Sequence, residues 1–204
     1  KRIGEQQKND RPMRFAYADP PYIGRAKRYY GNQSTYAGEV DHVALIASLK
    51  ASGYDGWALS CAVDIPSLRI IFNELPDDAR LCPWVKPGSA PPSSRGIHNM
   101  WEGLIVVGGR QEPPGKCDWL RAQPARFGGD LPGRKSIAFI AFLWRMLGAR
   151  PGDALMDLFP GTGIVGRAWE NLSRAALGDV LSGAGDDASL SAPNDESQPG
   201  LDNA

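Results

Sequence analysis

The hydrophobic pattern along this chain alternates between two periods, and the alternation predicts an α/β fold. Short apolar runs bounded by Pro, Gly or Asp predict buried strands. These runs lie at residues 14–18, 56–61, 79–85, 103–107 and 154–159, with a further short strand at 175–178. Apolar residues at helical spacing predict helices at about residues 43–49, 66–75, 136–147 and 164–172. Because strands that alternate with helices pair mostly in parallel, we expect one largely parallel sheet.

Segments without apolar periodicity set the predicted domain limits. Residues 1–13 are polar and basic and predict an N-terminal arm. Residues 181–204 are rich in Gly, Asp, Ser and Pro, a composition that cannot offset its ordering entropy, so we expect a disordered acidic tail after one domain at 14–180. Residues 23–41 and 109–134 are irregular, and loops of that length are usually functional. Because the first residue is Lys and not Met, we expect a sequence that is trimmed or incomplete at its start.

Charge is balanced over the whole chain but not along it. Lys and Arg total 23, and Asp and Glu total 23, which argues against a protein whose whole surface binds nucleic acid. Six acidic residues and no Lys or Arg lie between positions 179 and 204, so the rest of the chain carries 23 basic against 17 acidic side chains. The body of the protein is therefore basic.

Cysteine and histidine usage argues against several classes of site. The three cysteines, at 61, 82 and 117, form no close pair, which disfavours a disulfide scaffold or thiol metal site and favours a reducing compartment. With only His42 and His98 besides, we expect no metal centre. No uncharged apolar stretch approaches the roughly 18 residues that span a bilayer, and no signal peptide opens the sequence. We expect a cytoplasmic protein with no membrane partner.

A glycine turn follows the predicted strand at 154–159. The sequence from Asp157 to Gly163 places an acidic residue at a strand end and two glycines before a helix. In an open α/β sheet a ligand binds beyond such strand ends, where glycines let the backbone approach it. The turn lacks the third glycine of a dinucleotide site and the Lys-Ser/Thr of a phosphate loop, so it favours another nucleoside ligand. An ordinary tight strand-to-helix turn explains the same residues.

A second motif, Asp19-Pro20-Pro21-Tyr22, stands at the exit from the predicted strand at 14–18. The prolines have no N–H, so they hold a carbonyl in fixed geometry without a competing donor. The Asp19 carboxylate beside that carbonyl makes two acceptors that suit an exocyclic NH₂ group, and Tyr22 offers a face for a planar ring. A simple turn is the structural alternative, because Asp and Pro both initiate turns.

Together the two motifs resemble those of the S-adenosylmethionine (SAM)-dependent amino-methyltransferases that modify N6 of adenine or N4 of cytosine. The resemblance covers residues 14–180 and places the DPPY motif before the cofactor motif, as in the β-type permuted order and in adenosine methyltransferases that act on RNA. It implies a Rossmann-like methyltransferase fold, with six to seven strands and helices on both faces. It also implies SAM as cofactor and DNA as partner. An element that begins with Asp instead of Ser favours adenine N6.

The resemblance also implies roles for individual residues. The catalytic residues would be Asp19, Pro20, Pro21 and Tyr22. The cofactor would be bound by Asp157, Phe159, Gly161, Gly163, Asp179, Lys135 and Ser136, of which Asp179 would hold the ribose at the end of the strand at 175–178, and Lys135 and Ser136 would approach the amino acid moiety. Basic and aromatic residues after the DPPY motif would bind nucleic acid: Arg25, Lys27, Arg28 and Tyr30. Residues 84–87 and 98–102 also look like the central part of these enzymes.

Three alternatives stay open. The same chemistry could act on RNA or on a protein side-chain amide, and an inactive SAM-binding subunit that needs a partner would carry the same motifs. Residues 109–134 are too short for the recognition domain of sequence-specific members, so we expect short-site specificity or reliance on a homodimer or a separate specificity partner. The segment 23–41 could also be no more than a solvated loop.

Overall fold

The structure, a computed structural model, describes residues 11–32, 38–88, 96–111, 117–125, 135–161 and 163–182. They form one six-stranded sheet in the order β5-β3-β4-β2-β1-β6. The strands are β1 (Arg14–Ala18), β2 (Gly56–Cys61), β3 (Arg80–Val85), β4 (Trp101–Gly108), β5 (Leu120–Arg121) and β6 (Ala154–Asp157). The helices are α2 (Ala26–Tyr30), α3 (His42–Ala51), α4 (Ile65–Phe72), α5 (Ile137–Leu147) and α6 (Ile164–Ser182).

Strand direction brings most of the strand ends to one edge of the sheet. β1 pairs in parallel with β2 and β6, and β3 pairs in parallel with β5. Only β4, among the described strands, runs the other way, antiparallel to β2 and β3. The carboxyl ends of β1, β2, β3, β5 and β6 therefore lie along one edge, here called the carboxyl edge, where ligands bind in open α/β sheets.

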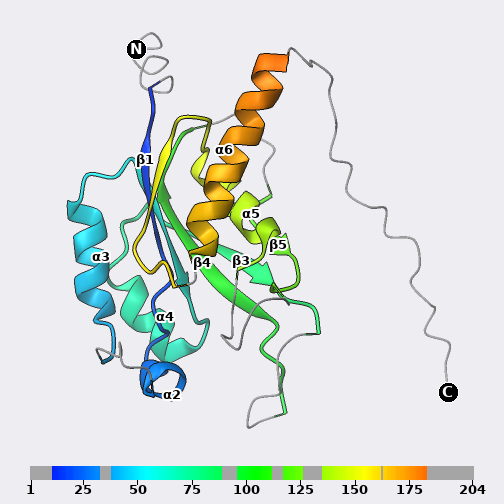
Figure 1. Cartoon of the computed structure of the whole chain (residues 1–204). Helices are drawn as coiled ribbons and strands as arrows, with labels where there is room; N and C mark the ends of the chain where they lie inside the picture. The colour runs from blue at the N-terminus through cyan, green and yellow to red at the C-terminus, as the bar shows by residue number, and fades with distance from the viewer. Residues whose placement is uncertain are drawn as a thin grey trace, which may run out of the picture.

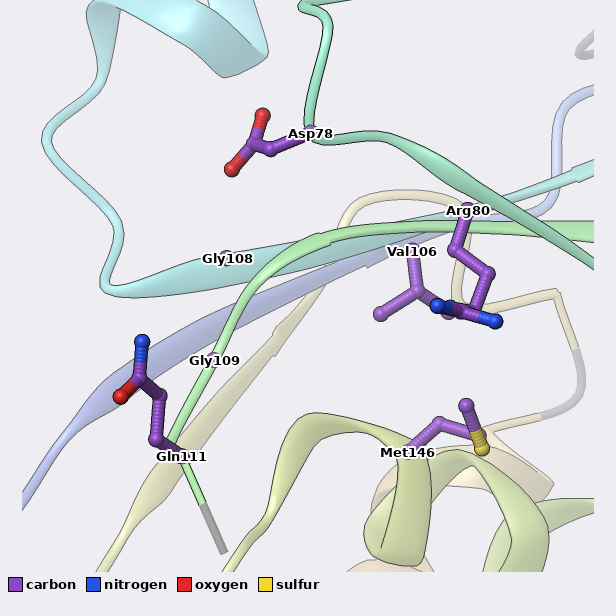
Figure 2. A pocket seen from close by; sticks show the side chains of 7 residues that line it. All are labelled: Asp78, Arg80, Val106, Gly108, Gly109, Gln111 and Met146. Atoms are coloured by element: carbon purple, nitrogen blue, oxygen red, sulfur yellow. The ribbon is translucent and has the colours of Figure 1, made fainter. Parts of the chain in front are cut away.

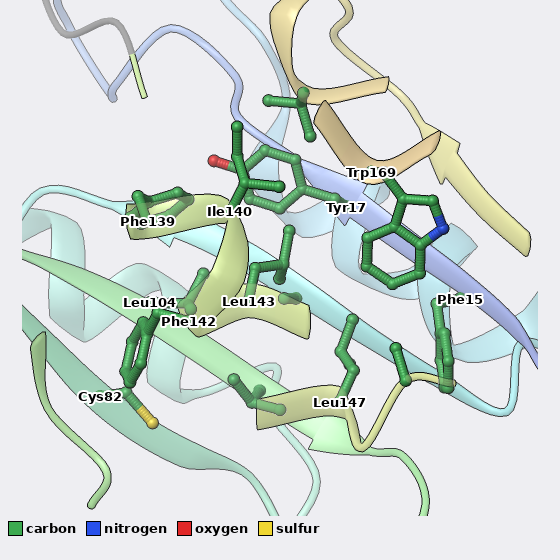
Figure 3. Packing of buried hydrophobic residues seen from close by; sticks show 14 of the residues in the cluster. Phe15, Tyr17, Cys82, Leu104, Phe139, Ile140, Phe142, Leu143, Leu147 and Trp169 are labelled. Carbon is green, nitrogen blue, oxygen red and sulfur yellow. The ribbon is translucent and has the colours of Figure 1, made fainter. Parts of the chain in front are cut away.

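Helices cover both faces of the sheet, with α3 and α4 on one face and α5 and α6 on the other (Figure 1). The first face buries Ile46, Leu49 and Ile71 of the helices against the sheet. The second face is larger, and Figure 3 shows its side chains from α5, α6 and the strands packed together. Aliphatic side chains buried this way each contribute about 1.5–3 kcal/mol, so the two-sided packing holds the sheet and its carboxyl edge in a fixed shape.

Local sequence explains where the helices begin and end. Asp41 and Asp64 accept the backbone N–H of the residue three positions on, each at 3.0 Å, and so cap α3 and α4. Ser136 caps α5 in the same way, with its hydroxyl 3.3 Å from the nitrogen of Phe139. Gly148 ends α5 with a φ of +63°, a left-handed conformation that favours glycine.

A buried ion pair joins three elements at the edge opposite the carboxyl edge. Arg110 follows β4 and Asp153 precedes β6, and the two side chains approach to 2.6 Å. Asp153 also accepts the backbone N–H groups of Met13 and Arg150, both at 2.7 Å. Burial by itself would raise the pKa of Asp153, but these donors lower it below its ordinary value. Residues 11–13, assigned to the N-terminal arm, thus contact the body of the protein.

The strands predicted at 14–18 and 56–61 are confirmed to the residue, and the α/β order is confirmed. Three predictions were wrong. The irregular segment 23–41 contains α2, and the segment 109–134 contains the two-residue strand β5. The strand predicted at 175–178 does not form, because α6 continues through it to Ser182. Ala and Leu at 175–177 are strong helix formers, and a short apolar run distinguishes poorly between strand and helix.

Candidate functional site

The two motifs lie side by side at the carboxyl edge. β1 and β6 are neighbours in the sheet, with Tyr17 opposite Asp157, and the nitrogen of Leu158 donates to the carbonyl of Tyr17 at 2.9 Å. Ile23, just after the DPPY motif, and Phe159 both pack against one hydrophobic cluster. Segments about 140 positions apart in the sequence therefore meet in one site.

Asp19 is held at this edge by a lysine and a serine. The ammonium nitrogen of Lys135, at the start of α5, lies 3.0 Å from Asp19 Oδ1. Ser60 of β2 lies near Asp19 and helps to lower its pKa, and the Ser60 hydroxyl lies 2.8 Å from that of Tyr17, which is buried. Lys135 is only 4% exposed, whereas Asp19 is 29% exposed. The carboxylate that the sequence predicts to be catalytic is thus held by Lys135, while part of it remains accessible to solvent.

A second carboxylate, Glu102 of β4, lies next to this pair. It forms an ion pair with Lys86, just after β3, and its Oε2 is 3.7 Å from the ammonium nitrogen of Lys135. The same oxygen is buried and has no hydrogen-bond partner in the described part of the chain. Both ammonium groups also lie over the Trp84 ring, at 5.3 Å for Lys135 and 5.4 Å for Lys86. Two carboxylates and two ammonium groups therefore balance in charge.

Burial and neighbouring charges shift the pKa values of the side chains at this site in different directions. Burial raises the pKa of Asp19 above its ordinary value, although Lys135 and Ser60 counteract the rise. Burial would also raise the pKa of Glu102, but Lys135 and Lys86 lower it, so that this carboxyl is held ionised. Burial raises the pKa of Tyr22 well above its usual range, with the charge of Glu102 adding to the effect. Tyr22 is therefore neutral, and its hydroxyl lies near the Glu102 carboxylate.

The glycine turn has the features of a nucleoside site. Asp157 Oδ1 accepts the N–H of Phe159 at 3.2 Å, while its Oδ2 is buried without a hydrogen-bond partner among the described residues. Gly161 and Gly163 have φ values of +47° and +69°, which a residue with a Cβ adopts only under strain. Burial raises the pKa of Asp157, and the nearby Asp19 adds to the rise. An unpartnered acceptor beside glycines at the start of α6 fits a ligand with hydroxyl or amino donors.

The remaining predicted residues are placed as follows. Ser136 caps α5, next to Lys135. Arg25 lies 3.9 Å from Asp64, and Lys27 and Arg28 are exposed on α2, one turn beyond Tyr22. The side chains of Tyr30 and Asp179 lie outside the described part of the structure. The backbone of Asp179 is in α6, so the prediction that it ends a strand was wrong.

Sequence reasoning missed three residues of the site: Ser60, Lys86 and Glu102. Lys86 and Glu102 stand in the segments 84–87 and 98–102, whose resemblance to the family carried no assigned role. The available signal was position, because polar residues at the ends of buried strands meet at one edge of a parallel sheet. Knowing that β4 is antiparallel was also necessary, since Glu102 lies near its beginning.

Other features of the described residues do not form part of this site. A hollow of about 230 Å³ opens at the opposite edge (Figure 2) and is lined by Asp78, Arg80, Val106, Gly108, Gly109, Gln111 and Met146. In the described part of the chain, no three His, Cys, Asp or Glu side chains gather as metal ligands would. No helix there has the length and apolar character needed to cross a bilayer.

Comparison with known proteins identifies the fold. The chain is similar to the crystal structure of the M1.HpyAVI–SAM complex, with a TM-score of 0.52 and 16% identity, over 84% of this chain and 83% of that chain. It is also similar to a crystal structure of M1.HpyAVI, with a TM-score of 0.50 and 18% identity, over 84% and 81%. No protein-family model and no curated protein matches the sequence. The predicted fold class is confirmed: this is a Rossmann-like methyltransferase fold with a mostly parallel sheet and helices on both faces.

Proposed function

We propose that this protein transfers a methyl group from SAM to the exocyclic amine of a DNA base, with adenine N6 as the target. The observation that carries the proposal is the meeting of Asp19 and Tyr22 with the glycine turn after Asp157 on adjacent parallel strands. An amine-holding motif thereby lies within reach of a nucleoside site. The similar fold of M1.HpyAVI, which was crystallised as a complex with SAM, supports the choice of cofactor.

Asp19 and the Pro20 carbonyl act by holding the two N–H bonds of the target amine. An amine conjugated to its ring is a poor nucleophile because its lone pair is delocalised. Two fixed acceptors localise that lone pair and direct it, so catalysis rests on positioning and electrostatics. Lys135 and Ser60 hold Asp19 in place, and Tyr22 stacks on the base. With SAM bound, the methyl carbon would pass from the sulfonium sulfur, which would leave as a neutral thioether, to the amine nitrogen, and the methylated amine would release one proton to water.

The residues of the glycine turn fit the cofactor. When bound, SAM supplies an electrophilic methyl group on a sulfonium centre. Asp157, with its unpartnered Oδ2, would accept a donor from the nucleoside, and Gly161 and Gly163 leave room for it. Phe159 is half-buried beside them and offers an apolar surface for the ring. The ammonium group of Lys135 lies 3.0 Å from Asp19 of the catalytic motif. We propose that the same group also contacts the amino acid moiety of the cofactor.

The cations of α2 are proposed to contact nucleic acid phosphates next to the site. Arg25 is joined to Tyr22 by a turn, in which its nitrogen donates to the Tyr22 carbonyl at 2.8 Å. Lys27 and Arg28 follow on the same short helix and are exposed. A target base in a duplex must flip out to reach the DPPY motif, and phosphate contacts hold the strand while the base flips. Replacing all three cations by Ala should weaken DNA binding and flatten its salt dependence.

The direct test is transfer of labelled methyl from SAM to duplex DNA, single-stranded DNA, RNA and protein, followed by digestion to nucleosides or amino acids. We expect label on N6-methyladenine from DNA. Asp19→Ala should abolish it, whereas Asp77→Ala, which removes an exposed carboxylate beyond α4, should not. Label recovered only from RNA or protein would reject DNA as the substrate. Binding of SAM without transfer to any substrate would reject the enzymatic role of the isolated chain.

A further inference from the structure

Glu102 is a largely buried carboxylate that the proposed reaction does not yet use. Its side chain is 16% exposed, and β4 places it near the end of the strand that meets the carboxyl edge. Burying an ionised carboxylate is costly unless it is paired. An apolar side chain of similar size could fill this position without that cost, so we expect the Glu102 charge to have a role.

Glu102 lies next to the groups that hold the DPPY motif. Its Oε1 pairs with Lys86 at the end of β3, and its Oε2 faces Lys135 at 3.7 Å. Lys135 is in turn 3.0 Å from Asp19, so its ammonium group is shared by the two carboxylates. The Tyr22 hydroxyl lies nearby and interacts electrostatically with Glu102. The titratable groups that face it are Lys86, Lys135, Tyr22, Asp19, Tyr17 and Cys61.

We propose that Glu102 is a positioning residue for methyl transfer, which holds Lys135 between two carboxylates. The inference rests on the proposed function. Lys135, attracted by both Asp19 and Glu102, is kept from pairing with Asp19 alone, so the Asp19 carboxylate retains acceptor capacity for the amine.

The substitution Glu102→Gln separates charge from shape. Gln keeps the volume and one oxygen acceptor, but it leaves two ammonium groups facing the single carboxylate of Asp19. Lys135 then pairs more closely with Asp19. Because misplacement of a positioning group by about 1 Å can cost a factor of about 100, we expect kcat to fall roughly 10- to 100-fold. The affinity for SAM, measured by calorimetry, should change less than about threefold, because the glycine turn is untouched.

The decisive experiment is a double-mutant cycle with Lys135→Met, which removes the ammonium group but keeps most of the apolar stem. If Glu102 acts through Lys135, the double variant should be no more than about threefold slower than the slower single variant. Glu170→Gln, an exposed carboxylate on α6, is the matched control and should keep the unaltered kcat. An unchanged kcat in E102Q, or effects of the two substitutions that multiply, would overturn the inference.

Folding is followed separately by urea unfolding, so that a stability defect is not mistaken for a positioning effect. If E102Q does not fold, Glu102→Asp keeps the charge but withdraws it from Lys135 by one methylene, and should show the same loss of kcat. Wild-type kcat in E102D would then count against the inference. If the unaltered chain transfers methyl while E102Q is equally fast, only this inference fails. If the unaltered chain transfers none, the proposed function fails and takes this inference with it.

Discussion

Lys135→Met is the substitution whose consequences the structure specifies most fully. It removes the ammonium group 3.0 Å from Asp19 and 3.7 Å from Glu102, yet preserves most of the apolar stem that packs near Trp84 and Phe139. Glu102 still has Lys86 as a partner. Of the described residues whose interaction lowers the pKa of Asp19, Ser60 remains, whereas burial already raises that pKa. The substitution therefore acts chiefly on Asp19.

The charge separation sets the scale of the effect. Two unit charges 3.0 Å apart attract by about 5.5 kcal/mol at an effective dielectric constant of about 20. Desolvation of the pair offsets part of this, and breaking a buried pair typically costs about 3–5 kcal/mol of unfolding free energy. The cost falls on the ionised form of Asp19. It therefore grows as the pH rises past the pKa values of the folded carboxyl, which burial places above the ordinary aspartate value, and it disappears at lower pH, where the folded carboxyl is protonated.

Activity should follow pH in the opposite sense to stability. Without Lys135 the pKa of Asp19 rises further, and a protonated carboxyl is a weaker acceptor than a carboxylate for the N–H bond of the target amine that Asp19 holds. We expect K135M to transfer methyl slowly near neutral pH and to recover as the pH is raised, while its stability deficit against the unaltered chain grows. Methyl-transfer rates at saturating SAM and urea unfolding, both measured from pH 5 to 9, check the two trends.

The control for this experiment is Lys50→Met, which removes an exposed ammonium group that donates to the Glu74 carbonyl. It should leave both pH profiles unchanged. A K135M protein with the unaltered rate at pH 7, or with an acidic limb at the same pH as the unaltered chain, would refute the account of Asp19. A stability deficit that is constant with pH would refute the electrostatic origin of the cost.

Three further predictions concern the scaffold and the turn. Arg110→Met should lower the unfolding free energy by about 3–5 kcal/mol at pH 7, because Asp153 is left buried without its cation. Since the pKa of Asp153 is lowered in the folded protein, urea unfolding should show the deficit shrinking below about pH 4, and a deficit under 1 kcal/mol at pH 7 would contradict the assignment. Gly161→Ala should cost about 1–2 kcal/mol through its φ of +47°, although a Cβ meets nothing closer than 3.9 Å, and should weaken SAM binding measured by calorimetry. A thiol reagent at pH 8 should modify Cys117 rapidly in the native protein but not Cys61, whose pKa burial raises to about 12; rapid modification of every thiol before unfolding would show that the core opens.

The elements that could be predicted from the sequence share one property, which is that their signal is local. The strand at 14–18 and the strand at 56–61 are apolar runs bounded by turn residues, and both appear with the predicted limits. The helix predicted at 136–147 starts one residue later, after its Ser cap. The strand predicted at 175–178 was wrong because the local signal is ambiguous there. Four small and apolar residues suit a helix or a strand, and the neighbouring residues determine which of the two forms.

The chemistry of the motifs was also present in the sequence. The residue types predict which groups can accept hydrogen bonds, at Asp19 and Pro20, and where the backbone can turn, at the glycines after Asp157. These properties depend on covalent structure alone. They predict the kind of ligand, an amine beside a nucleoside, without any knowledge of where the motifs lie in space.

Tertiary structure decided which residues act together. The order β2-β1-β6 brings positions near 19 and 157 to one edge, and it follows from packing helices on both faces of the sheet, which no single segment encodes. Asp19 pairs with Lys135, and Glu102 pairs with Lys86 and Lys135, because strands and the start of a helix from distant parts of the chain converge there. Proton affinity depends on burial and neighbouring charge, both properties of the folded molecule, so the sequence could name the carboxylates but could not say which of them is held ionised.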